Sequence, residues 1–110
     1  MNTMAETIVL CPVTAIAEGQ IHSECLPDGK VIALYKVDGA IYATDDTCTH
    51  GAASLSEDGM LHGKEVECGF HFGRFDITTG AACASPCTVA LKTYPVNIID
   101  GMVSVELGEV

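Results

Sequence analysis

The amino-acid sequence contains no tryptophan and has few aromatic and few basic residues. Its 110 residues include three tyrosines, three phenylalanines and only five lysines and arginines against fifteen acidic residues, which makes the formal net charge −10. So acidic a chain is not expected to bind nucleic acid or an anionic membrane surface, because both would repel it. The sequence also lacks an apolar run near the ~18 residues of a membrane span, and its start lacks the basic region of a signal peptide. We therefore expect a cytoplasmic protein with no membrane contact.

Motifs of common enzyme classes are also missing. The sequence shows neither a phosphate-binding glycine loop nor a serine nucleophile in a recognisable context. A chain of 110 residues can bury an ordinary core but is too short for an additional catalytic module. We therefore expect a single domain over residues 1–110, monomeric, that carries out no bond chemistry of its own.

Two Cys-His pairs predict a metal centre. Cys48 and His50 are separated by one residue, and Cys68 and His71 by two. Each pair lies in a short segment that contains glycine, and the seventeen residues between His50 and Cys68 are enough for a turn and a β-hairpin that brings the two pairs together. We predict that Cys48, His50, Cys68 and His71 are the metal ligands and that no residue of the chain is catalytic.

Two thiolates and two imidazoles suit one [2Fe-2S] cluster, in which the Cys pair holds one iron and the His pair holds the other. Two ferric ions, two sulfides, two thiolates and two neutral imidazoles carry no net charge, whereas the same core with four thiolates is dianionic. The neutral centre accepts an electron more easily, and such centres have potentials of about −150 to +300 mV against about −400 mV for the four-Cys plant type. The ligand set therefore predicts one-electron transfer at moderate potential.

Structural zinc is the alternative for the same four ligands, because zinc also binds two Cys and two His in a tetrahedron. Zinc sites usually place two Cys about two to four residues apart and two His about three to five apart. Here each segment supplies one Cys and one His, which favours the cluster but leaves a zinc-stabilised interaction module open. Colour separates the two, since only the cluster absorbs visible light.

The residues around the two pairs resemble a known family, the Rieske-type ferredoxins, and in particular the electron-transfer components of bacterial aromatic-ring hydroxylating dioxygenase systems. One motif covers residues 48–56 with Gly59, and the other covers residues 67–76 with Gly80, in the order and spacing of that family. The chain after these motifs also resembles the family, at Pro86, Leu91, Tyr94 and Val96. The resemblance therefore spans nearly the whole chain and makes zinc the weaker interpretation.

The resemblance implies a fold, partners and a function. The implied fold is all-β, a Rieske-type antiparallel β-sandwich or barrel as base domain with a small cluster-binding subdomain at about residues 45–86. The implied function is one-electron transport from an NAD(P)H-dependent flavin reductase to the terminal Rieske oxygenase, with His50 and His71 on the iron nearer solvent. The acidic surface favours weak, salt-sensitive docking to such partners. A small Rieske subunit of another oxidoreductase complex is the alternative, and it would purify in a stable complex.

The high-potential branch of the same family carries features that this chain lacks. That branch has a disulfide between the cluster loops, at positions that correspond here to Ala53 and Phe70. It also has a Ser and a Tyr whose hydroxyls bond to cluster sulfurs, where this chain has Gly73 and Phe75. Because hydrogen bonds to sulfur raise the potential, the resemblance implies a midpoint at the low end of the Rieske range.

Short apolar and β-branched runs predict strands independently of the resemblance. These runs cover residues 8–10, 31–37, 40–44, 94–99 and 102–107. Asp38-Gly39 and Asp100-Gly101 each separate two runs and are typical of type I′ hairpin turns, which need positive φ at both central residues. No stretch shows sustained helical periodicity with start and stop signals.

The remaining cysteines and histidines are predicted to be structural. Since cytoplasmic thiols stay reduced, we expect buried or partly buried thiols at Cys11, Cys25, Cys83 and Cys87. The spacing of Cys83 and Cys87 leaves a redox dithiol or second metal site open as an alternative. His22, in a segment that we expect to be irregular, and His62, at an expected hairpin turn, lack a Cys partner at the family spacing and are predicted to lie on the surface.

Overall fold

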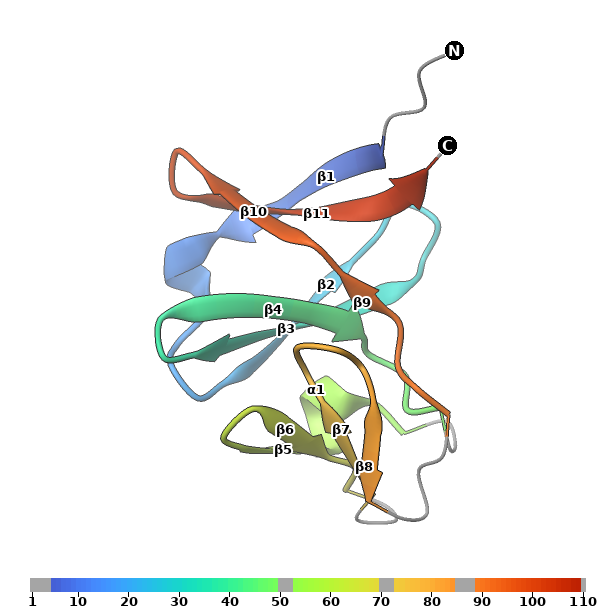
Figure 1. Ribbon diagram of the computed structural model, residues 1–110. Coiled ribbons are helices and arrows are strands. Elements are labelled where there is room, and N and C mark those ends of the chain that lie inside the picture. The colour runs from blue at the N-terminus through green and yellow to red at the C-terminus, as the bar shows by residue number, and fades with distance from the viewer. Residues whose placement is uncertain (1–4, 50–52, 70–72, 85–88, 110) are drawn as a thin grey trace.

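The computed structural model describes residues 5–49, 53–69, 73–84 and 89–109, which form three antiparallel sheets. The first sheet has the order β1-β11-β10, the second β2-β3-β4-β9 and the third β5-β6-β7-β8 (Figure 1). The first consists of β1 (Ala5–Pro12), β11 (Met102–Glu109) and β10 (Val96–Ile99). The second consists of β2 (Ile21–Cys25), β3 (Val31–Val37), β4 (Ala40–Asp45) and β9 (Thr93–Tyr94). The third consists of β5 (Met60–His62), β6 (Glu65–Glu67), β7 (Arg74–Asp76) and β8 (Ala82–Ala84).

Strand β3 is buried on both faces and separates two hydrophobic cores. Ile32 and Leu34 pack in the core between the first and second sheets. Ala33, Tyr35 and Val37 point the opposite way, into a core shared with the third sheet. Because side chains alternate along a strand, a strand between two cores needs apolar residues at consecutive positions. This explains why residues 31–37 read as a nearly continuous apolar run.

The third sheet lies in the chain between β4 and β9. The two ends of this insertion meet at the second sheet, where the Asp45 amide donates to the Lys92 carbonyl at 2.9 Å and Thr44 pairs with Thr93. The single-turn helix α1 (Leu55–Asp58) lies between the insertion's entry and its first strand. Figure 1 shows α1 and strands β5 to β8 together beneath β3 and β4. The fold therefore has a base of two sheets with a smaller third sheet attached to it.

The predicted all-β class is confirmed, and so are both hairpin turns. Asp38 and Gly39 have φ of 53° and 78°, and Asp100 and Gly101 have 53° and 76°, as type I′ turns require. The strand predicted at 31–37 has the same bounds in the structure, and the one at 40–44 extends to Asp45. The run 94–99 is instead divided at Pro95, which has no amide to donate, so that β9 pairs with β4 and β10 pairs with β11 in another sheet.

Several elements were not predicted. Strand β2 occupies the segment that we expected to be irregular, and it pairs antiparallel with β3 from Ile21–Tyr35 to Cys25–Val31. Strands β5 and β6 form the β-hairpin expected between His50 and Cys68, whereas β7 and β8, each three residues long, are too short to show a reliable alternation and were not predicted. Within the described ranges, no helix has the length and apolar character needed to cross a membrane.

Gly80 fixes the segment that leads back to the base. Its amide donates a hydrogen bond to the Asp76 carbonyl at 2.7 Å, and its carbonyl accepts one from the Leu91 amide at 2.8 Å. Its φ is +81°, and a Cβ here would overlap the Leu91 carbonyl oxygen. Leu91 is buried in the core beneath β3, so this close approach joins the third sheet to the base.

Gly80→Ala and Gly101→Ala are predicted to differ in stability. Both residues have positive φ, where a Cβ costs about 1–2 kcal/mol, but only Gly80 faces a backbone atom that a Cβ would strike, since nothing lies within 4 Å at Gly101. We expect Gly80→Ala to lower the free energy of unfolding by about 1–3 kcal/mol more than Gly101→Ala does. Urea unfolding of the two variants measures the difference, and equal losses would contradict the proposed contact.

Candidate metal centre

The structure places two of the four predicted ligands in one buried cluster. Cys48 follows β4 and Cys68 follows β6, and both are nearly inaccessible, at 2% and 0% exposure. They share the core beneath β3 with Leu55, Val66 and Phe75 among others. His50 and His71 lie outside the described residues. The two thiol-bearing loops thus converge, as the sequence predicted.

The loop that carries Cys48 is closed by backbone pairing and by one buried carboxylate. The Cys48 amide donates to the Ala53 carbonyl at 2.9 Å, and Thr47 pairs with Ser54. The Asp46 side chain, in a residue only 5% exposed, accepts hydrogen bonds from the Ser54 hydroxyl at 2.6 Å and the Ser56 amide at 2.8 Å. Charge-assisted hydrogen bonds of this kind are stronger than neutral ones, so Asp46 holds the loop against the start of α1.

Neither Asp46 nor α1 was predicted from the sequence, although a signal for the helix is present. Ser54 and Glu57 have the Ser-x-x-Glu spacing of a capping box. In the structure, Ser54 is the N-cap of α1, and its hydroxyl accepts a hydrogen bond from the Glu57 amide at 3.3 Å. A single helical turn leaves no periodic pattern, so the cap was the one available signal.

The loop that carries Cys68 is closed in a similar way. The Cys68 amide donates to the Gly73 carbonyl at 2.7 Å, between the paired strands β6 and β7. Gly69 lies so close to the end of α1 that a Cβ would overlap the Asp58 carbonyl oxygen. Only glycine permits this approach, which seats the second loop on the helix that follows the first loop. The helix is therefore the element against which both loops are placed.

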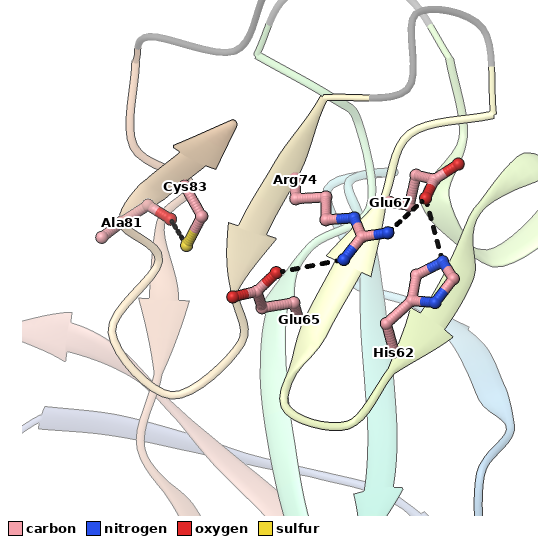
Figure 2. Close-up of polar contacts among 6 residues, drawn as sticks. All are labelled: His62, Glu65, Glu67, Arg74, Ala81 and Cys83. Carbon is pink, nitrogen blue, oxygen red and sulfur yellow. Dashed lines mark hydrogen bonds and ion pairs between the residues drawn. The ribbon is translucent and has the colours of Figure 1, made fainter. Parts of the chain in front are cut away.

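An ion-pair network lies on the strands next to Cys68 (Figure 2). Glu67 accepts a hydrogen bond from Arg74 at 3.1 Å and lies 2.9 Å from His62 as an ion pair, and Arg74 also pairs with Glu65 at 3.6 Å. The network joins β5, β6 and β7 across the sheet. Because its side chains are partly exposed, each pair is worth little by itself, and its main effect is to fix the arrangement of the three strands. His62 lies at the hairpin turn and is exposed, as predicted.

A second group of contacts ties the candidate centre to the base. The Thr49 hydroxyl donates to the Val89 carbonyl at 2.6 Å, which links the first loop to the returning chain. The Tyr94 hydroxyl donates a short hydrogen bond to Asp45, and Lys30 pairs with Asp45 at 3.3 Å. Burial, followed by the Asp45 carboxylate, raises the pKa of Tyr94 to about 12, so the phenol keeps its proton and remains a donor.

The residues present fit an iron–sulfur centre. Cys48 and Cys68 supply two buried sulfur donors in an apolar core, where a thiolate is unfavourable unless a cation balances its charge. Position 73 has no side chain, and Phe75 is fully buried without a hydroxyl, so these two positions offer no hydroxyl donor to sulfur. Phe75 packs in the same core as the two thiols and helps to exclude water from them.

The other cysteines only partly follow the prediction. Cys11 is buried, but Cys25 and Cys83 are exposed, so the expectation of buried or partly buried thiols is wrong for these two. Both belong to the outermost strands of their sheets, β2 and β8, where one side has no neighbouring strand. The Cys83 thiol donates to the Ala81 carbonyl at 3.4 Å (Figure 2). Cys87 lies outside the described residues, so a Cys83–Cys87 site stays untested.

Comparisons with known proteins point to one family. Residues 6–95 match the family model of the Rieske [2Fe-2S] domain. The chain is 50% identical over 105 residues to the ferredoxin component of the p-cumate 2,3-dioxygenase system of Pseudomonas putida, covering 96% of this chain and 89% of that protein. The fold matches the Sphingomonas yanoikuyae B1 ferredoxin with a TM-score of 0.87 and 42% identity, over 92% of this chain and 98% of that one. It also matches a chain in the complex of reduced oxygenase and oxidized ferredoxin of carbazole 1,9a-dioxygenase. The TM-score is 0.87 and the identity 39%, over 94% of this chain and 95% of that one.

Asp46→Asn is predicted to loosen the first loop. The Asn side chain has one acceptor oxygen in place of two and carries no negative charge, so it can replace only one of the two hydrogen bonds that the carboxylate accepts. We therefore expect the free energy of unfolding to fall by about 1.5–3 kcal/mol. Asp28→Asn is the matched control, because Asp28 accepts a hydrogen bond from the Lys30 amide at 2.9 Å in an exposed turn, and it should cost about 0.5 kcal/mol or less. Denaturant unfolding of both variants makes the comparison, and similar losses would argue against a clamping role for Asp46.

Proposed function

Because this chain belongs to the Rieske [2Fe-2S] family, as its resemblance in sequence predicted, we propose that it is a one-electron carrier, the Rieske-type ferredoxin of an aromatic-ring hydroxylating dioxygenase system. The observation that carries the proposal is the burial of Cys48 and Cys68 in one core, each at the start of a loop closed by a backbone hydrogen bond. The identity of 50% to a dioxygenase ferredoxin component supports it.

We propose that Cys48 and Cys68 bind one iron of the [2Fe-2S] cluster and that His50 and His71 bind the other. The cluster, when bound, accepts and releases one electron at a time. Burial of the two Cys keeps water from the sulfur ligands, and the absence of a hydroxyl at positions 73 and 75 supports a potential at the low end of the Rieske range. Because the cluster itself takes up and releases the electron, the carrier requires no substrate site.

We propose two protein partners, a flavin-dependent ferredoxin reductase as electron donor and a terminal Rieske oxygenase as acceptor. A chain of similar fold occurs in the complex of oxygenase and ferredoxin of carbazole 1,9a-dioxygenase, which supports an oxygenase partner here. The net charge of −10 favours basic docking surfaces on both partners. The carrier is proposed to act as a cytoplasmic monomer, because it must leave one partner before it meets the next.

Removal of any proposed ligand is predicted to abolish the cluster. Cys48→Ala, Cys68→Ala, His50→Ala and His71→Ala should each lose visible absorbance and most of the two irons and two labile sulfides expected per chain. His62→Ala and Cys83→Ala are the matched controls, because both residues lie in the same sheet, on its two edge strands β5 and β8, and outside the proposed ligand set. Iron, sulfide and absorbance are measured on the purified variants. A colourless wild-type protein, or a ligand variant with a full complement of iron, would refute the assignment.

Electron transport is tested by reconstituting turnover. Purified protein is added to a panel of NAD(P)H-dependent flavin reductases and terminal oxygenases, and hydroxylated aromatic product is measured. We expect product only with all three proteins present, and we expect the rate to fall as salt rises from about 50 to 500 mM, because salt screens charge at distances beyond ~10 Å. A protein that keeps its cluster but supports turnover with none of the panel would count against the carrier role.

A further inference from the structure

We propose that Cys11, His22 and Glu24 form a second metal site, suited to a zinc-like divalent cation and separate from the [2Fe-2S] centre. One sulfur, one nitrogen and one oxygen donor from these residues lie within 4.8 Å of one another. Cys11 belongs to β1 in the first sheet, whereas His22 and Glu24 belong to β2 in the second. The site therefore bridges the two sheets of the base.

The strand register explains why the three side chains meet. His22 pairs with Leu34 and Glu24 with Ile32, and residues directly opposite on antiparallel strands project to the same face. Leu34 and Ile32 face the core between the first and second sheets, which also contains Cys11. His22 and Glu24 thus project toward the first sheet from the edge strand of the second.

The burial of the three residues suits a site with an entrance. Cys11 is only 5% exposed, whereas the side chains of His22 and Glu24 are 28% and 27% exposed. A cation can reach the thiol past the imidazole and the carboxylate. The site is also physically distinct from the [2Fe-2S] centre, because Cys11 packs in the core between the first and second sheets and Cys48 and Cys68 pack in the core beneath β3.

The donor set and its spacing match the chemistry of zinc. Thiolate, imidazole and carboxylate are the three donors that zinc uses in proteins, and three protein ligands leave a fourth position for water. Zinc–ligand bonds of about 2.0–2.3 Å in a tetrahedron put donor atoms about 3.3–3.8 Å apart. The His22 Nε2 and Glu24 Oε2 atoms are now 2.6 Å apart, so small side-chain rotations that separate this pair and draw in the sulfur would complete the site.

The environment of Cys11 also favours a cation over a bare thiolate. Burial, and after it the negative charge of Glu24, raise the pKa of the Cys11 thiol. A divalent cation would balance the negative charges of both the thiolate and the carboxylate.

The test measures metal binding to the protein with its cluster in place. Purified protein is titrated with Cd²⁺, whose bond to thiolate absorbs in the ultraviolet, and with Zn²⁺ in equilibrium dialysis, while iron content and visible absorbance are followed. We expect one added cation per chain, with no loss of iron, and a cadmium–thiolate band. Constant iron and visible absorbance separate this result from any failure of the proposed electron-carrier role.

Two variants test the ligands, and a third serves as the control. Cys11→Ser and His22→Gln should each weaken Cd²⁺ binding by about tenfold or more, and Cys11→Ser should also remove the thiolate band. Cys25→Ser is the matched control, because Cys25 lies at the end of the same strand β2 but is exposed, and it should leave both unchanged. His22→Gln keeps the buried thiol intact, so it remains informative if Cys11→Ser fails to fold. The proposal is overturned if the wild type binds no added cation, if His22→Gln binds as tightly as wild type, or if Cys25→Ser abolishes binding.

Discussion

The burial of strand β3 on both faces is the constraint on which the rest of the structure depends. Ile32 and Leu34 close the core of the base, and Ala33, Tyr35 and Val37 close the core that contains the two thiols. A single strand thus belongs to both hydrophobic cores, and neither can form fully without it. The Tyr35 hydroxyl, buried in the core beneath β3, forms a hydrogen bond with Thr44 at 2.8 Å, so the polar group that β3 places in this core is also satisfied. The candidate centre is consequently part of the main fold and is not a loosely attached appendage.

Hydrogen bonds that close each loop position the thiols, because the apolar core cannot orient them. Hydrophobic burial is non-directional, so it brings Cys48 and Cys68 together without setting their geometry. Direction comes from the backbone bonds that close each loop, from the Asp46 carboxylate on the first loop and from the close approach of Gly69 to α1. A carrier benefits from such a rigid frame, since a metal centre whose ligands barely move reorganises little when it gains or loses an electron.

The acidic surface and the two cores have different roles in the molecule. The cores hold the thiols and exclude water, and the charge of −10 governs which proteins the surface attracts. The inferred Cys11 site lies in the base, on the far side of β3 from the thiol core. A cation there would join the two sheets of the base, so it would act on the stability of the scaffold and leave the ligand set of the electron-transfer centre unchanged.

The sequence by itself determined the all-β class and the two Asp-Gly hairpins, and it predicted that the segments of Cys48 and Cys68 come together, because these depend on local turn chemistry, on apolar runs and on residue spacing. It could not reveal α1 as a shared support, Asp46 as a clamp or β2 as a strand. A four-residue helix, a buried carboxylate and a mostly polar edge strand have little local signature. Their roles depend on partners far away in the chain, such as Gly69 against Asp58 or His22 opposite Leu34. Only the tertiary structure decides such pairings, because they arise when sheets and loops pack together.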